Sequence, residues 1–182
     1  MRDNILTVRE IQMSDANDYT DYWLTSGDDY LIGMGVDLSK MPTREQLQQK
    51  LSEIIEAPYN KKSNYCIVWE LDEKAIGHSS VFPIIFGEEA YMHLHMWTPE
   101  VRRKGLGPEF IKLTLPFYFN NLKIKRLLCE PYALNPAPHK ALERAGFKFV
   151  KDYITTPGNI CFEQPVKQYE LTLLDFNKLN EK

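Results

Sequence analysis

The chain has 182 residues, a formal net charge of −3 at pH 7, and 43% hydrophobic against 26% charged residues. This size and balance are typical of one globular domain with a sizeable core, and they exclude a disordered or fibrous chain. No run approaches the roughly 18–20 apolar residues of a membrane span, and the N-terminus lacks the apolar segment of a signal peptide. We therefore expect a single domain over residues 1–182, in the cytoplasm, with no membrane partner.

The three cysteines, Cys66, Cys129 and Cys161, are widely spaced, and each stands in an apolar run. They form neither the paired spacing of a zinc site nor the even-numbered set of a disulfide framework. The sequence therefore predicts no metal site and a reducing compartment. Because Cys129 has no activating neighbour, we expect it to pack in the core and not to carry an acyl group.

Charge is distributed unevenly along the chain. Seven acidic residues and no basic one lie between Arg9 and Lys40, whereas seven basic and two acidic residues lie from Glu100 to Arg126. The basic segment suits an anionic cofactor. The acidic segment either attracts a cationic acceptor, such as a protonated amine, or forms a solvated helix face.

The first half of the chain predicts a strand, two helices and a hairpin. Ser14 can cap one helix, and Thr43 forms a capping box with Gln46 ahead of apolar residues at helical spacing. The turn at residues 72–74 joins two apolar runs. The predicted elements are a strand over residues 6–11, helices beginning at Ser14 and Thr43, an irregular stretch over residues 27–41, and strands over residues 65–71 and 75–85.

The second half predicts four more strands and two more helices. Pro116 lies inside one of these helices, and we expect it to kink or shorten that helix. Prolines at the start and Gly146 at the end mark the other. The predicted elements are strands over residues 90–98, 126–132, 147–155 and 162–173, and helices over residues 109–121 and 136–145.

The loop over residues 98–108 carries the first functional motif. It follows a predicted strand, contains two glycines and three consecutive cations (Arg102, Arg103 and Lys104), and leads into a helix. Glycines let several backbone N–H groups converge, and a helix N-terminus adds partial positive charge. This arrangement predicts a phosphate-binding loop; the alternative is an exposed basic loop at a helix start.

A second motif follows about thirty residues later. Asn135, Leu142 and Gly146-Phe147 fit the pattern Asn-x(6)-Leu-x(3)-Gly-Phe, and the loop fits Arg-x-x-Gly-x-Gly. Together the two motifs, within residues 90–147, resemble the acyl-CoA N-acyltransferases of the GNAT superfamily. With compatible flanks, the resemblance covers nearly the whole chain.

The resemblance implies an α/β (α+β) fold with a central, mostly antiparallel, twisted sheet of about seven strands and about four helices. The sheet is expected to open into a V between its fourth and fifth strands. The resemblance also implies acetyl-CoA as the acyl donor, with its pyrophosphate on the loop and its pantetheine arm beside the fourth strand. The residues thereby assigned to the cofactor are Met96, Trp97, Thr98, Arg102, Arg103, Lys104, Gly105, Leu106, Gly107, Pro108 and Asn135.

His93 is the first candidate for the general base. It lies nine residues before Arg102, where the siderophore-type branch of the superfamily has a histidine and the related aminoglycoside 6′-acetyltransferases have an aspartate. Histidine is suited to this role because its pKa lies near 7. His95, two residues along the same strand, is the rival, and both histidines packing in the strand is the alternative.

Glu130 and Tyr132 complete the candidate catalytic set. The spacing from Glu130 to Asn135 also occurs in the siderophore-type enzymes, which usually carry aspartate where this chain has Tyr132. Glu130 either orients a histidine or takes the ammonium proton, or is an exposed carboxylate at a strand end; Tyr132 either protonates the leaving thiolate or lines the cleft. Leu142 replaces the tyrosine that many members use as general acid, as it does in several members that acetylate ribosomal proteins.

The resemblance thus implies an N-acetyltransferase that acts on a primary amine of a small molecule or a protein N-terminus, as a monomer or homodimer. Two other classes remain. The missing tyrosine allows a catalytically silent acyl-CoA binder that works as a sensor or scaffold. A nucleic-acid module is disfavoured by the isoelectric point of about 5.8 and by the lack of interleaved aromatic residues, so we expect no nucleic-acid partner.

Overall fold

A seven-stranded sheet forms the centre of the molecule, in the order β1-β2-β3-β4-β5-β7-β6. The structure is a computed structural model, and it describes residues 4–181. Neighbouring strands are antiparallel except β4 and β5, which are parallel, and this confirms the predicted fold class. The strands are β1 (Leu6–Glu10), β2 (Tyr65–Leu71), β3 (Lys74–Ile85), β4 (Glu89–Met96), β5 (Arg126–Cys129), β6 (Lys148–Thr155) and β7 (Gln164–Thr172).

The described residues form six α-helices, against about four predicted. They are α1 (Ala16–Thr25), α2 (Asp28–Gly33), α3 (Arg44–Glu56), α4 (Gly107–Leu122), α5 (Pro136–Ala145) and α6 (Leu173–Asn180). The predicted capping box at Thr43 is present at the start of α3. The prediction missed α2, which is only six residues long, and α6, whose N-cap Thr172 accepts a hydrogen bond from the Asp175 N–H. Short helices carry too little apolar periodicity to be recognised.

Pro116 does not end α4, contrary to the expectation of a shortened helix. Residues on both sides of it are buried, including Phe110 and Ile111 before it and Tyr118 and Leu122 after it. We attribute the continuation to this packing, which outweighs the lost N–H donor of proline.

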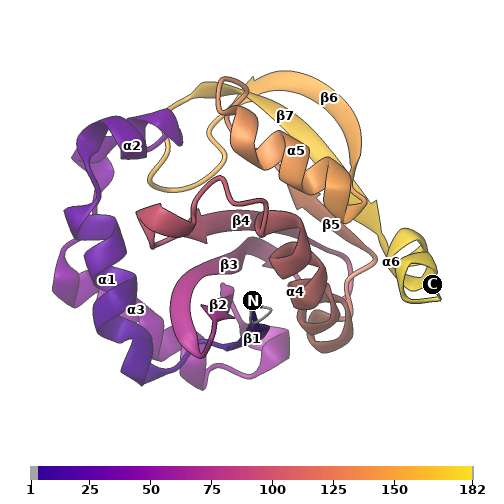
Figure 1. Cartoon of the computed structure of the whole chain (residues 1–182), viewed down its shortest axis with the longest axis horizontal. Coiled ribbons are helices and arrows are strands. Elements are labelled where there is room, and N and C mark those ends of the chain that lie inside the picture. Colours follow the sequence, from indigo (N-terminus) through magenta and orange to yellow (C-terminus); the bar gives the residue numbers. More distant parts are fainter. Residues whose placement is uncertain (1–3, 182) are drawn as a thin grey trace.

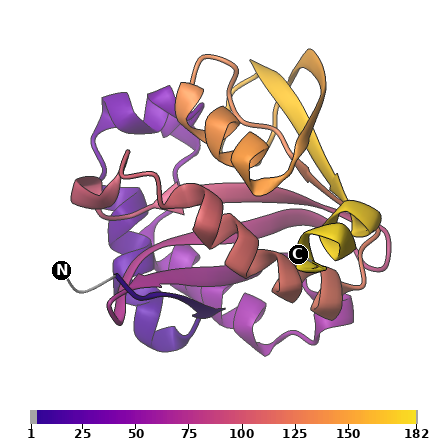
Figure 2. The same cartoon turned by 45° about the vertical axis from the view of Figure 1, so that its right-hand side comes forward.

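The helices cover both faces of the sheet, because successive side chains of β2 point in opposite directions. Ile67 and Trp69 lie on the face covered by α4, where the rings of Trp69 and Phe110 stack with their centroids 5.2 Å apart. Cys66 and Val68 pack on the other face against Leu51 and residues of α1. Figures 1 and 2 show α4 crossing one face, with α1 and α3 on the opposite side.

The sheet opens into the predicted V between β4 and β5. The two strands pair only from Glu89 with Arg126 to Met92 with Cys129. Beyond that point β4 stays paired with β3 as far as Met96. The chain after β5 instead follows β7, where Tyr132 forms a bridge with Val166. The second half of β4 therefore faces an opening and not a neighbouring strand (Figure 1).

Candidate active site

A cleft of about 530 Å³ lies where the sheet opens. Its walls come from the second half of β4, the segment after β5, helices α1 and α3, and the loop between β6 and β7. Residues 157–161 of that loop, here called the strap, lie against the segment after α2. The Asp37 N–H donates to the Ile160 carbonyl at 2.8 Å, and Val36 pairs with Cys161. The strap thereby closes one side of the cleft.

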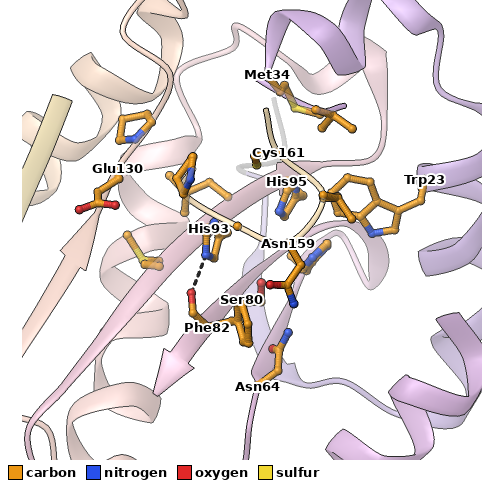
Figure 3. A pocket seen from close by; sticks show the side chains of 18 of the residues that line it. Trp23, Met34, Asn64, Ser80, Phe82, His93, His95, Glu130, Asn159 and Cys161 are labelled. Atoms are coloured by element: carbon orange, nitrogen blue, oxygen red, sulfur yellow. Dashed lines mark hydrogen bonds between the residues drawn. The ribbon is translucent and has the colours of Figure 1, made fainter. Parts of the chain in front are cut away.

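His93 lies in the middle of this cleft (Figure 3). Its Nε2 is 2.8 Å from the Phe82 carbonyl oxygen. A carbonyl only accepts, so Nε2 carries the proton and Nδ1 keeps a lone pair. Burial lowers the pKa of His93, while the Phe82 carbonyl and the charge of Glu130 partly offset that shift. The imidazole is therefore neutral at pH 7, which is the form a base requires.

His95 shares this face of β4 but is enclosed by aromatic rings. Its ring stacks on His78 at 4.6 Å and meets the edge of Trp23 at 4.7 Å, and Nδ1 lies 3.2 Å from the Tyr22 hydroxyl. Burial and the neighbouring histidines hold its pKa well below the usual value. Trp97 donates to His78 Nδ1 at 2.8 Å, which extends this packed group. His95 is thus more constrained than His93.

Glu130 lies at the β5 side of the cleft, across from Asn159 with His93 between them (Figure 3). Its Oε1 accepts hydrogen bonds from the Tyr153 hydroxyl and, at 2.6 Å, from Gln168 Nε2. These bonds hold the carboxylate as a fixed negative charge that favours protonation of His93 through space. Glu130 makes no direct hydrogen bond to His93 among those of the described residues.

Tyr132 also lines the cleft, with its ring against that of Phe162 at a centroid distance of 5.8 Å. Leu142 in α5 is fully buried in the core, so the position where the resemblance implies a tyrosine acid carries no phenol. Cys129 is 3% exposed, its thiol donates to the Met92 carbonyl at 3.0 Å, and burial raises its pKa strongly. This environment opposes thiolate formation and agrees with a packing role for Cys129.

The loop before α4, predicted to bind phosphate, contains two residues with left-handed backbone. Arg103 and Gly105 adopt left-handed conformations, with φ of 63° and 78°. Where a left-handed residue precedes a right-handed one, as Gly105 precedes Leu106, successive N–H groups turn toward one side. The loop runs directly into Gly107 and the buried Pro108 at the start of α4, while Leu106 packs against the core. Arg103 and Lys104 are exposed, where their charges can meet phosphate.

Arg102 differs from its expected role. Its guanidinium turns inward: Nε and Nη2 donate to the Met96 carbonyl at 3.1 and 2.9 Å, Nη2 also reaches the Trp97 carbonyl, and the group lies 3.8 Å over the Tyr30 ring. Carbonyl and aromatic partners thus hold Arg102 at the end of β4. In this structure its side chain braces the loop and is not directed outward as a free cation.

The remaining expected cofactor residues occupy two positions. The carbonyl of His95 points toward β3, since a Cβ added at Gly77 would lie 2.5 Å from it. By alternation, the backbone groups of Leu94 and Met96 face the open V, where an extended pantetheine amide could pair with them. Trp97 and Thr98 instead turn their N–H groups to the Ile76 carbonyl on β3.

Asn135 lines the cleft and caps α5, its side chain accepting from the Ala137 N–H at 3.4 Å. Of the expected cofactor residues, Asn135 is the one that lines the cleft. Three others, Trp97, Thr98 and Arg102, line a second hollow of about 470 Å³ next to α1.

Arg144 is a residue that sequence reasoning missed. A Cβ added at Gly105 would lie 4.0 Å from Arg144 Nη1, so α5 brings another cation beside the predicted phosphate-binding loop. Its position forty residues after the loop gave no signal; only the packing of α5 against α4 brings the two together. The strap, with its residue Asn159, lies between two predicted strands and was assigned no functional role.

The acidic segment does not supply the cleft with negative charge. Asp15 pairs with Arg9 at 2.7 Å, Asp21 pairs with Arg44, and Asp37 lies 3.4 Å from Lys40. Of the acids in residues 10–37, those that border a hollow are Asp18 and Asp21, and the hollow is the second one. Their placement gives no support to the expectation that they attract an acceptor to the cleft.

Two other properties of residues 4–181 bear on function. No group of three or more His, Cys, Asp or Glu side chains in this part of the chain is arranged to hold a metal ion. Within the same range, no helix combines the length and apolar character needed to cross a membrane.

The sequence matches the acetyltransferase (GNAT) domain family over residues 6–148. A comparison with curated proteins gave no match.

Solved structures with the same fold include three acetyltransferases. A spermidine N-acetyltransferase from Vibrio cholerae, in complex with CoA and spermine, has a TM-score of 0.77 at 16% identity and covers 94% of this chain and 98% of its own. The aminoglycoside acetyltransferase AAC(6')-Ib, in complex with coenzyme A, has a TM-score of 0.74 at 15% identity, and the match covers 97% of this chain and 99% of that one. The ribosomal L7/L12 alpha-N-protein acetyltransferase RimL, in complex with CoA, has a TM-score of 0.73 at 13% identity, and the match covers 92% of this chain and 93% of that one. At these identities the likeness shows the fold.

Proposed function

Since the chain belongs to the GNAT acetyltransferase family, we propose that it transfers an acetyl group from acetyl-CoA directly to a primary amine, with His93 as the proton acceptor. The observation that carries this proposal is the neutral imidazole of His93 inside the cleft, beside the open half of β4. The family match supports the reaction, and the position and tautomer of His93 support its assignment as the base.

The loop and the open strand account for binding of the donor. Backbone N–H groups after Arg102, the N-terminus of α4, and the cations Arg103, Lys104 and Arg144 bind the pyrophosphate. The pantetheine arm extends along the V and pairs with the backbone of Leu94 and with the N–H of Met96, whose carbonyl is taken by Arg102. Holding thioester and amine together in this way contributes the largest part of the rate enhancement.

The chemical step then requires one proton acceptor and stabilisation of the oxyanion. As the amine nitrogen attacks the thioester carbon, His93 Nδ1 takes its proton, and the fixed charge of Glu130 stabilises the imidazolium that results. Backbone N–H groups of the open half of β4 donate to the oxyanion. Collapse breaks the C–S bond, and the thiolate leaves either unaided or with a proton from Tyr132.

The kind of acceptor is also part of the proposal. The related structures are named for spermidine, for aminoglycosides and for the α-amino group of ribosomal protein L7/L12. The acceptor here is accordingly a small amine or a protein N-terminus. Free thiols at Cys66, Cys129 and Cys161 support a cytoplasmic location, where cysteines remain reduced.

A screen for thiol release tests the proposal. Acetyl-CoA is mixed with the protein and a panel of amines, and free CoA is followed with a thiol reagent, with boiled protein as control. We expect amine-dependent CoA release accompanied by the N-acetylated product. Binding of acetyl-CoA without release for any amine or N-terminal peptide would favour the second candidate, a silent acyl-CoA sensor, which the burial of Leu142 at the general-acid position allows.

A further inference from the structure

The charges around the cleft identify a class of acceptor, and this inference rests on the proposed function. The charged side chains that line the cleft are two lysines, Lys40 and Lys50, and one glutamate, Glu130. A site for a polycation needs several carboxylates to replace the water lost by each ammonium group. The cleft wall has one.

That one carboxylate, on the side of the cleft next to β5, already accepts hydrogen bonds from other side chains of the protein. Tyr153 and Gln168 both donate to Glu130 Oε1. Figure 3 shows Glu130 on one side of His93, with Asn64, Trp23 and Asn159 on the other. The part of the cleft beyond His93, away from the V, therefore has no acidic side chain in its wall.

The two lysines differ in the contacts that their ammonium groups make within the protein. Lys40 Nζ donates to the Cys161 carbonyl at 2.8 Å and lies 3.4 Å from Asp37, so it fastens the strap. Lys50 is exposed on α3, and among the described residues it takes part in no ion pair. Its Nζ lies 5.6 Å from the centroid of the Phe82 ring.

Phe82 connects this cation to the candidate base. The Phe82 carbonyl accepts the His93 Nε2 proton, while its ring lies beneath Lys50 Nζ. A bound molecule with its amine at His93 can therefore present a second group to Lys50 on the same wall of the cleft.

The wall between these two groups is neutral and partly unsatisfied. Asn64, Ser80 and Asn159 gather at this end of the cleft (Figure 3), and Asn64 Oδ1 is a buried atom without a hydrogen-bond partner in the described chain. The amide N–H groups of Asn64 and Asn159 and the Ser80 hydroxyl can donate to a carboxylate without adding charge, whereas the unpaired Asn64 Oδ1 is an acceptor and suits a donor such as the ammonium group. Trp23 and Leu47 provide an apolar surface beside them.

We propose that the acceptor is an amine that also carries an anionic group, as an amino acid does, and that Lys50 binds the anion while the amine faces His93. This sets the chain apart from the spermidine and aminoglycoside enzymes that share its fold, because a second ammonium group would meet Lys50 and no carboxylate. A carboxylate and a phosphate satisfy the same chemistry.

Calorimetric titration of the CoA-loaded protein tests this without requiring turnover. The probes are 5-aminopentanoate, 1,5-diaminopentane, pentylamine and 5-aminopentyl phosphate, which share one chain and differ at its far end. We expect an anionic probe to bind tighter than pentylamine by up to about fivefold, the upper range of one solvent-exposed ion pair. The diamine is expected to bind more weakly than pentylamine, and the two anionic probes distinguish carboxylate from phosphate.

Charge substitutions identify the residue. Lys50→Gln should remove the preference for the anionic probe, and Lys50→Glu should make the diamine the tighter ligand. Lys61→Glu, a change at an exposed lysine outside the cleft wall, should leave the order unchanged. The assignment is wrong if no anionic probe binds, if the diamine binds as tightly as 5-aminopentanoate, or if Lys50→Glu leaves the order unaltered. Failure of acetyl transfer despite anion binding would count against the proposed function and not against the anion site.

Discussion

At the scale of single residues, the position of one proton distinguishes His93 from its neighbours. The Phe82 carbonyl fixes the proton on Nε2, so the lone pair lies on Nδ1 without any need for a carboxylate partner. His95 has its Nδ1 beside a tyrosine hydroxyl and its ring between other aromatic groups. The sequence could place both histidines on one face of one strand, but the contacts that separate them come from β3 and α1.

Replacing His93 by alanine removes the proposed base but none of the groups assigned to the donor. We expect turnover to fall by about 10²–10⁴-fold, the usual range for a lost general base. The dissociation constant of acetyl-CoA, measured by calorimetry, should stay within about twofold because the phosphate-binding loop is untouched. His95→Ala serves as comparison and should lose less turnover. Full activity in the His93 variant would exclude it as the base.

The pH dependence of turnover follows from the lowered pKa of His93. A base must be neutral, so activity falls as the pH drops through that pKa, which lies below the ordinary 6.5. With saturating amine, kcat should therefore fall toward acid pH with a midpoint below 6.5. The decline should be absent from the residual activity of His93→Ala. A midpoint above pH 7 would indicate a different titrating group.

The thiol of Cys129 is not required for transfer. Burial raises the pKa of this thiol and keeps it protonated, and the thiol donates a hydrogen bond to the Met92 carbonyl on the neighbouring strand. Cys129→Ala should retain most of kcat, with a loss of stability of about 1 kcal/mol for the vacated volume, seen as a lower melting temperature. An acetyl group found on Cys129 by peptide mass spectrometry would overturn this view.

At the scale of elements, the position of the loop from β4 to α4 could be predicted because it depends on local sequence order, whereas its phosphate-binding role stays a prediction. Two glycines, a run of cations and a helix start identify it in any sequence. The inward turn of Arg102 could not be predicted, since it depends on the carbonyls at the end of β4 and on Tyr30 in α2. The short helix α2 was itself missed, and with it the partner of Arg102.

Gly107 offers a matched pair of variants for the phosphate-binding loop. A Cβ there would lie 3.5 Å from the Ala141 Cβ, an ordinary contact, so Gly107→Ala should fold and bind acetyl-CoA within about threefold of the parent, a change below 1 kcal/mol. Gly107→Glu adds negative charge at the N-terminus of α4, where it competes with phosphate. We expect its dissociation constant for acetyl-CoA to rise at least about tenfold, by charge repulsion at the anion site.

The melting temperature of both Gly107 variants should remain near that of the parent, which separates binding from folding. Equal affinity of the glutamate and alanine variants would remove this loop from the cofactor site.

At the scale of the whole molecule, the cleft is assembled from segments far apart in the chain. The V follows from the order of strands and was predictable, whereas the acceptor side depends on the strap meeting residues 35–40 and on α3 placing Lys50 over Phe82. Contacts such as Lys40 with Cys161 join positions separated by 121 residues and leave no periodic signal in the sequence. The acidic segment, conspicuous in the sequence, likewise places no carboxylate in the cleft wall and borders the second hollow through Asp18 and Asp21.

The buried histidines make stability depend on pH. Burial lowers the pKa of His78 to about 3, so between pH 6.5 and 3 the unfolded chain binds a proton that the folded chain does not. The free energy of unfolding should therefore fall as pH drops below 6.5, with His78 accounting for about 2 kcal/mol at pH 5. Urea titrations at pH 7 and 5 measure this; His78→Gln, which can still accept from Trp97, should show a smaller difference.

The central claim, direct transfer of an acetyl group in a cleft with His93 as base, is tested most directly by a single-turnover experiment. Protein in excess over acetyl-CoA is mixed with the best amine of the thiol-release screen, quenched over time, and analysed by mass spectrometry of both the small molecules and the intact protein. We predict that N-acetylated amine and free CoA appear together, that the protein mass never changes, and that the His93→Ala variant slows the appearance of both. Intact acetyl-CoA after long mixing, or an acetylated protein formed before the product, would contradict the account.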